Sequence, residues 1–230
     1  TRPASPARQA ALRLPADAVM LVCPSDHHIA DSAAFAEAAA AAAQLAAQDW
    51  LVSFGIEATA PETGFGYLHR GDAIDGSAGY RVARFVEKPD LERAQAFLAS
   101  GEYAWNGGIF AFRAGAFLAE LEAHRPAIAA AARDAVANGK ADGARFHPDP
   151  DAFARIESES VDYAVMENTA RAAMVPADMG WSDIGNWQAL RDARARDEAG
   201  NTVTGRAELV GCSNVLVESD GPRVSVIGLD

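Results

Sequence analysis

Cysteine is scarce in this sequence, which contains only Cys23 and Cys212 among its 230 residues. Both lie within apolar runs, and no Cys-X-X-Cys spacing indicates a metal site or a redox pair. We therefore expect two buried, reduced thiols and a cytoplasmic protein. The five histidines are scattered without the spacing of zinc ligands, so no histidine metal site is expected.

The sequence also lacks a long apolar run and an export signal. Its longest run of low polarity, residues 38–43, is far shorter than the roughly 20 apolar residues that a membrane span needs. No charged and then apolar segment opens the sequence. We expect no association with a membrane.

Basic residues are outnumbered, with 20 Lys and Arg against 32 Asp and Glu and a net charge of −12. Nucleic-acid phosphates attract basic surfaces, so this excess of acid argues against a nucleic-acid partner. A small phosphorylated ligand remains compatible, because it needs only a few local cations or a divalent metal ion. No Gly-X-Gly-X-X-Gly motif follows a predicted strand, which disfavours a dinucleotide-dependent oxidoreductase.

What the sequence does contain is an alternation of short apolar runs and helical stretches. Runs typical of strands lie at residues 18–23, 50–56, 80–87, 109–112 and 172–175. Helical patterns lie at residues 33–48, 91–100, 114–122 and 128–137, and a polar loop is expected at 138–151. The first run has the pattern of a strand buried on both faces, and Ser32 is a candidate N-cap for the first helix. This order predicts an α/β sandwich with a mostly parallel central sheet.

From about residue 200 the pattern changes to short β-like pieces separated by Gly205, Gly211 and Gly221, with no helical stretch between them. We expect one large domain at residues 1–199 and the start of a small all-β appendage at residues 200–230.

Polar residues gather just after, or just before, the predicted strands. They lie in the segments that contain Asp26, Gly66, Glu87 and Lys88, Asn106, and Asp183. Ligands collect at the carboxyl ends of strands in α/β sheets, so these segments are expected to converge on one cleft. Each has an ordinary alternative when taken alone: Asp26 as a helix cap, the glycines as turn formers, and Glu87 with Lys88 as a surface pair on opposite faces of a strand.

Six motifs, taken together, resemble one family. PSDH, FGIEATAPETGFGYLHRG, FVEKPD, WNGGIFAF, VDYAVMEN and DMGWSDIGNW occur in the order and approximate spacing found in bacterial mannose-1-phosphate guanylyltransferases, some of which are fused to a mannose-6-phosphate isomerase domain. The resemblance covers residues 19–230. EKP is shared across sugar nucleotidyltransferases, whereas the combination is specific to the guanylyl branch. The resemblance implies a Rossmann-like nucleotidyltransferase fold and a role in GDP-mannose and polysaccharide biosynthesis.

The resemblance implies a reaction between GTP and α-D-mannose 1-phosphate that gives GDP-mannose and pyrophosphate. A sugar-phosphate oxygen attacks the α-phosphorus, so catalysis requires positioning and charge neutralisation. By resemblance, Asp26 and Asp183 hold a Mg²⁺ ion. Trp181 and Trp187 would then lock the loop that carries Asp183.

The same resemblance implies a sugar pocket. Lys88 would contact the sugar phosphate, and Glu87 would accept hydrogen bonds from sugar hydroxyls. Asn106 and the backbone of Gly66 would complete the pocket. We expect the protein to act as a homodimer.

One part of the family pattern does not occur here. The family's glycine-rich loop, of the form GGxGTRLWPLSR, cradles the triphosphate, whereas this sequence begins TRPASPARQAAL. We expect the sequence to be incomplete at its N-terminus, because the motifs downstream are intact. The residues that contact the triphosphate and guanine are therefore not assigned. Two alternatives stay open: a thymidylyl- or uridylyltransferase for another sugar 1-phosphate, and a non-catalytic subunit that binds a sugar nucleotide.

Overall fold

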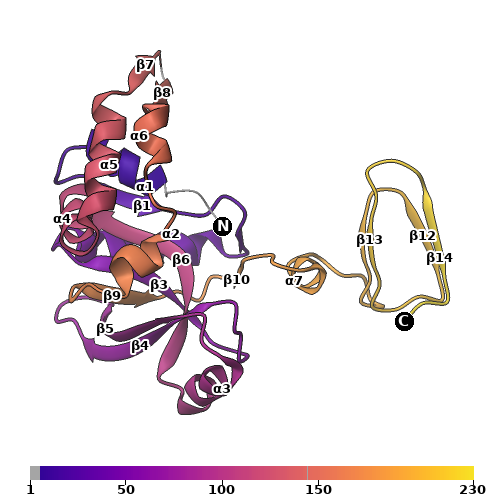
Figure 1. The fold of residues 1–230 in the computed structure, drawn as a ribbon. Helices are drawn as coiled ribbons and strands as arrows, with labels where there is room; N and C mark the ends of the chain where they lie inside the picture. Colours follow the sequence, from indigo (N-terminus) through magenta and orange to yellow (C-terminus); the bar gives the residue numbers. More distant parts are fainter. Residues whose placement is uncertain (1–5, 144) are drawn as a thin grey trace. The chain divides into compact units, whose positions relative to one another are not determined.

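A computed structural model of the chain describes residues 6–143 and 145–230 (Figure 1). The described residues divide into two compact units, which are treated separately below. The first contains residues 6–24 and 31–179, and the second contains residues 25–30 and 180–230.

The first unit combines one six-stranded sheet, a short hairpin and a set of helices. The sheet contains β1 (Val19–Val22), β3 (Leu51–Glu57), β4 (Gly66–Ala73), β5 (Tyr80–Glu87), β6 (Tyr103–Arg113) and β9 (Ala172–Pro176), and the hairpin contains β7 (Lys140–Asp142) and β8 (Arg145–His147). The helices are α1 (Pro6–Arg13), α2 (Ser32–Ala46), α3 (Leu91–Ser100), α4 (Ala114–His124), α5 (Pro126–Ala137), α6 (Pro150–Ala154) and a π-helix, η1 (Asp162–Met166).

The sheet is mixed, and the prediction of a mostly parallel sheet is wrong. Its order is β1-β6-β3-β9-β5-β4, and only β3 and β9 pair in parallel within it. Two features explain why the sequence analysis did not predict the antiparallel strands. β4, which was not predicted, is joined to β5 by residues 74–79, too short a connection for a parallel crossover. β1 is an edge strand that leaves Val19 and Leu21 exposed, whereas its apolar run was expected to be buried on both faces.

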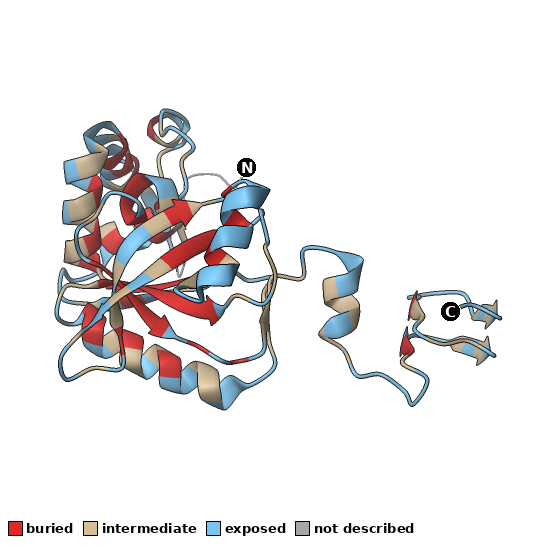
Figure 2. Cartoon of the chain, turned by 90° about the horizontal axis from the view of Figure 1, so that it is seen from below, coloured by how far each residue is buried: buried red, intermediate tan, exposed pale blue. Residues whose placement is uncertain are grey.

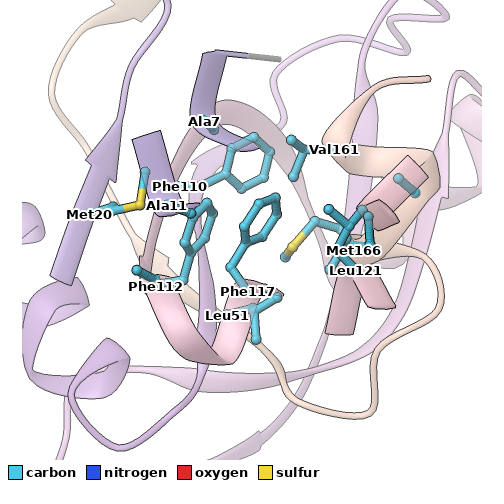
Figure 3. Close-up of a cluster of buried hydrophobic side chains, with 14 of the residues drawn as sticks. Ala7, Ala11, Met20, Leu51, Phe110, Phe112, Phe117, Leu121, Val161 and Met166 are labelled. Atoms are coloured by element: carbon cyan, nitrogen blue, oxygen red, sulfur yellow. The ribbon is translucent and has the colours of Figure 1, made fainter. Parts of the chain in front are cut away.

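The sheet lies between two layers of helices (Figure 2). One buried cluster joins α1, α4, α5 and η1 to strands β1, β3 and β6 (Figure 3). Within it, the rings of Phe112 and Phe117 stack with their centroids 4.5 Å apart. On α2, Phe35 lies against Phe54 of β3 with ring centroids 6.0 Å apart. The buried apolar residues from sheet and helices hold the strand ends that carry the candidate site.

Several local expectations need correction. Asp31, not Ser32, is the N-cap of α2, because its carboxylate accepts hydrogen bonds from the backbone N–H groups of Ala33 and Ala34. The predicted strand at residues 109–112 is part of the longer β6, and the predicted polar loop contains β7, β8 and the start of α6. Cys23 is exposed and Cys212 is only partly buried, so the expectation of two buried thiols is wrong.

The second unit contains short elements only: β2 (His28–Ile29), β10 (Trp181–Ser182), α7 (Trp187–Asp192), β11 (Thr202–Thr204), β12 (Ala207–Val210), β13 (Leu216–Glu218) and β14 (Val224–Ile227). β2 and β10 pair in an antiparallel manner. β11 pairs in parallel with β13, and β12 pairs in parallel with β14. Residues 200–230 therefore form strands and turns. In the part of the chain that the structure describes, no helix has the length and apolar character needed to cross a membrane.

Candidate functional site

Three of the predicted site residues, Gly66, Glu87 and Asn106, lie against one another in the first unit. Gly66 on β4 is opposite Glu87 on β5 in the strand register. A Cβ atom at Gly66 would lie 2.5 Å from Glu87 Oε2 and 3.3 Å from the Cβ of Asn106. A side chain at this position would therefore have to displace the Glu87 carboxylate.

Lys88 lies on the same side as Glu87, in contrast to the alternative of a pair on opposite strand faces. β5 ends at Glu87, and Lys88 adopts a left-handed backbone with φ of +46°. This conformation is uncommon for a residue with a side chain and is typical of constrained sites. It turns Lys88 so that its Nζ lies 3.6 Å from Glu87 Oε1. The Lys88 side chain is 58% exposed and that of Glu87 only 10%, so the ammonium faces outward above a buried carboxylate.

The side-chain amide of Asn106 is held at both ends. Its Nδ2 donates a hydrogen bond of 2.8 Å to Asp162 Oδ1, and its Oδ1 accepts one of 3.2 Å from the backbone N–H of Gly108. Asn106 is buried. These two contacts fix which end of the amide is the donor, and they leave one N–H and one lone pair of the side chain for a ligand.

Asp162 and Glu167 complete this cluster, and sequence reasoning assigned neither of them. They frame η1, where the backbone N–H of Glu167 donates to the carbonyl of Asp162 at 2.9 Å, the i to i+5 bond of a π-helix. Glu167 Oε1 in turn accepts a hydrogen bond of 3.2 Å from the backbone N–H of Glu87. The motif VDYAVMEN did contain a signal, since two carboxylates five residues apart flank an apolar stretch.

We refer to Gly66, Glu87, Lys88, Asn106, Asp162 and Glu167 as the polar cluster. Burial and the neighbouring Asp162 raise the pKa of Glu87 to about 7, although Lys88 opposes the rise. Burial also raises the pKa of Asp162, while its hydrogen bonds, including the one from Asn106, act in the opposite direction. With a pKa of about 7, Glu87 can present either a carboxylate or a carboxylic acid near neutral pH.

Asp26 and Asp183 both belong to the second unit. β2 and β10 pair with Ser182 opposite His28, so Asp26 and Asp183 both lie within two residues of the same end of this strand pair. Asp183 Oδ1 accepts a hydrogen bond of 3.1 Å from the backbone N–H of Gly185. A Cβ atom at Gly185 would lie 3.0 Å from Asp183 Oδ2, so glycine leaves room around this carboxylate.

The loop around Asp183 is held by Trp181 and by unusual backbone angles. Trp181 Nε1 donates a hydrogen bond of 3.0 Å to His27 Nδ1, and the two rings meet edge to face. Ile184 has a φ of +47°, which is an outlier for a β-branched residue. Trp187, in contrast, is 71% exposed. The expectation that both tryptophans lock the loop therefore holds for Trp181 and is wrong for Trp187 in this structure.

The donor set of this aspartate pair fits a divalent metal ion that keeps part of its water shell. Among the described residues, no group of three or more His, Cys, Asp or Glu side chains is arranged to hold a metal ion. Two carboxylates, with the remaining ligands from water and phosphate oxygens, are the usual protein contribution to a Mg²⁺ site. The open space that Gly185 leaves beside Asp183 is consistent with such ligands.

Comparisons with known proteins identify what the chain resembles. Residues 3–200 match the family model for nucleotidyl transferases. The xanthan biosynthesis protein XanB of Xanthomonas campestris pv. campestris strain B100 is 48% identical over 215 residues, and a mannose-1-phosphate guanylyltransferase of Klebsiella pneumoniae is 48% identical over 217 residues. Each alignment covers 93% of this chain but only 45% and 46% of the relatives, so the chain spans less than half of their length.

Solved structures show the same relationship at the level of the fold. A structure described as mannose-1-phosphate geranyltransferase from Thermus thermophilus superposes with a TM-score of 0.80 and 31% sequence identity, covering 92% of this chain and 60% of that chain. A mannose-6-phosphate isomerase from Helicobacter pylori superposes with a TM-score of 0.71 and 32% identity, covering 76% of this chain and 69% of that chain.

Proposed function

The chain belongs to the nucleotidyl transferase family, and on this premise we propose that the protein is a mannose-1-phosphate guanylyltransferase. It would convert GTP and α-D-mannose 1-phosphate to GDP-mannose and pyrophosphate. The observation that carries this proposal is the contact of Gly66, Glu87 and Asn106, with Lys88 turned to the same side. The curated relatives that bear this enzyme name add support.

The polar cluster has the groups that a sugar 1-phosphate needs. Glu87 and the remaining hydrogen-bonding capacity of Asn106 suit vicinal hydroxyls, since a sugar hydroxyl both donates and accepts. The exposed ammonium of Lys88 suits the phosphate, which stays close to solvent and to the nucleotide. Lys88 would thereby orient the phosphate oxygen that attacks the α-phosphorus. One P–O bond forms, the bond from the α-phosphorus to the bridging oxygen breaks, and pyrophosphate leaves.

We assign Asp26 and Asp183 to a divalent metal ion, and we propose Mg²⁺. When bound, the ion would neutralise charge that develops on the phosphoryl oxygens. The protein's own contribution is to hold Asp183 still, through the Gly185 N–H and the Trp181–His27 contact. A preorganised carboxylate avoids the cost of reorganisation during the reaction.

We also propose a cytoplasmic homodimer, with a nucleotidyltransferase domain at residues 1–199 and the start of a small β domain at residues 200–230. The two free cysteines support a reducing compartment. The parallel pairs β11–β13 and β12–β14 support a domain boundary near residue 200, because only strands and turns follow it.

The test is a measurement of pyrophosphate release by the intact protein with ATP, CTP, GTP, UTP or dTTP, each combined with mannose 1-phosphate or glucose 1-phosphate. We expect the highest kcat/KM for GTP with mannose 1-phosphate. A preference for dTTP or UTP with glucose 1-phosphate would replace this function with thymidylyl or uridylyl transfer. Calorimetric binding of GDP-mannose without pyrophosphate release in any combination would instead identify a non-catalytic binding subunit.

A further inference from the structure

We propose that Asp162 is a positioning residue for sugar recognition, which fixes the Asn106 amide and controls the charge of Glu87. This inference rests on the proposed function, because it treats the polar cluster as the sugar site. Asp162 itself is not placed in contact with the sugar. It acts through Asn106 and Glu87, the two side chains that the proposed function places in contact with the sugar.

The first step is the orientation of Asn106. An asparagine side chain can present either its oxygen or its nitrogen to a ligand, and a sugar hydroxyl pattern distinguishes the two. The hydrogen bond of 2.8 Å to Asp162 Oδ1 requires that Nδ2 faces the π-helix, and the Gly108 N–H requires that Oδ1 faces the turn. Without the Asp162 carboxylate, the amide would lose the partner that holds its donor end.

The second step is the π-helix. In an α-helix, residues five apart lie on different sides, whereas the i to i+5 bond of η1 brings Asp162 and Glu167 over one another. Glu167 then accepts a hydrogen bond from the backbone N–H of Glu87, while the charge of Asp162 raises the pKa of the Glu87 side chain. A local structure that is rarely used in proteins therefore aims two carboxylates at the end of β5.

The third step is the electrostatics of Glu87. The titratable or charged groups that face it in the described residues are Lys88 at the end of its own strand and Asp162, Tyr163 and Glu167 from the η1 segment. From β4 and β6 it meets neutral Gly66 and Asn106. After burial, Asp162 is the largest cause of the raised pKa of Glu87. Removing the charge of Asp162 while keeping its shape should let Glu87 ionise at a lower pH.

The experiment compares Asp162→Asn and Asp162→Ala in the intact protein, with Asp151→Asn as a matched loss of one exposed carboxylate on α6. For Asp162→Ala we expect the KM for mannose 1-phosphate to rise about tenfold, with the KM for GTP within about twofold of the parent, because only the sugar site loses a buried hydrogen bond. Asp151→Asn should leave both constants unchanged.

The second readout is the dissociation constant of GDP-mannose between pH 5.5 and 8.5, because neither phosphate of this probe titrates near neutrality. In the parent, tighter binding should develop as Glu87 ionises near pH 7. In Asp162→Asn, the same transition should move to lower pH, which a merely structural residue would not cause. If Asp162→Asn and Asp162→Ala match Asp151→Asn in both readouts, the inference is wrong. A parent protein that neither binds GDP-mannose nor turns over would overturn the proposed function instead, so the two failures are distinct.

Discussion

At the residue scale, the site depends on a few backbone angles and short contacts that a sequence pattern does not contain. Strand alternation predicts that neighbours such as Glu87 and Lys88 point to opposite faces. The left-handed conformation of Lys88 cancels that alternation and places its ammonium above the Glu87 carboxylate. The choice of Glu87, Lys88, Asn106 and Gly66 was made from motifs, whereas their common orientation required the structure.

The effect of backbone strain at Lys88 on stability can be separated from the effect of its charge on substrate binding. Lys88→Ala and Lys88→Gly both remove the ammonium, so each should raise the KM for mannose 1-phosphate about tenfold or more, as expected for a charge-assisted contact worth roughly 1.5–3 kcal/mol. Only glycine adopts φ of +46° without a steric cost, so Lys88→Gly should be more stable than Lys88→Ala by about 1 kcal/mol. Urea unfolding measures the difference in the free energy of unfolding. Equal stability of the two variants would show that Lys88 is not strained.

The raised pKa of Glu87 predicts a pH dependence of stability. A carboxyl group whose pKa is higher in the folded state than in the unfolded state binds its proton preferentially in the folded protein. Its favourable contribution is therefore present at low pH and is lost as the pH rises from about 4.5 to about 7. Glu87→Gln should flatten the pH dependence of the free energy of unfolding in this window. Glu57→Gln, which removes an exposed carboxylate at the end of β3, is the control for the loss of one negative charge.

At the element scale, the positions of the four longest helices and of most sheet strands were predicted, whereas the strand directions were not. The helices α1, α6, α7 and η1 were also not predicted. The range of α3 was predicted in full, since Leu91–Ser100 has a helical pattern and Gly101 ends the helix with φ of +67°. The range of β5 was also predicted. β4 was missed because it begins at the buried Gly66 inside a glycine-rich motif that resembles a turn. The direction of each strand is set by connections and partners far apart in sequence, so composition alone did not reveal the mixed sheet.

The N-terminus of α2 provides a direct test at this scale. The sequence suggested Ser32 as the cap, whereas the structure places the Asp31 carboxylate on the N–H groups of Ala33 and Ala34 at 2.9 and 3.0 Å. Asp31→Ala should lower the free energy of unfolding by about 1 kcal/mol, the usual loss for an N-cap. Ser32→Ala, one residue away, should change it by less than about 0.5 kcal/mol. The opposite ranking in thermal or urea unfolding would restore Ser32 as the cap.

At the scale of the whole molecule, the proposed function would require an acidic protein to bind two phosphorylated substrates through local chemistry. The net charge of −12 gives no general attraction for anions, so substrate binding would depend on individual groups such as Lys88 and on the proposed metal ion. The sequence analysis predicted that a few local cations or a metal ion would bind the phosphates, and the resemblance supplied the residues for these roles. It did not reveal that Asp26 and Asp183 belong to one compact unit and the polar cluster to the other.

This division predicts that metal binding and sugar recognition can be impaired separately. Asp183→Asn keeps the size of the side chain and an oxygen for the Gly185 N–H, but it removes a charged ligand from the proposed metal site. We expect turnover of GTP and mannose 1-phosphate to fall by about two orders of magnitude or more, because charge on the phosphoryl oxygens is no longer neutralised. Excess Mg²⁺ or Mn²⁺ should restore part of the activity, and thermal unfolding should be unchanged.

Asp220→Asn, an exposed position in the same unit, loses the same charge and should retain parental turnover and metal dependence. A loss of less than about tenfold in Asp183→Asn, with no change in the metal concentration needed for half-maximal activity, would show that Asp183 only shapes the turn between β10 and α7.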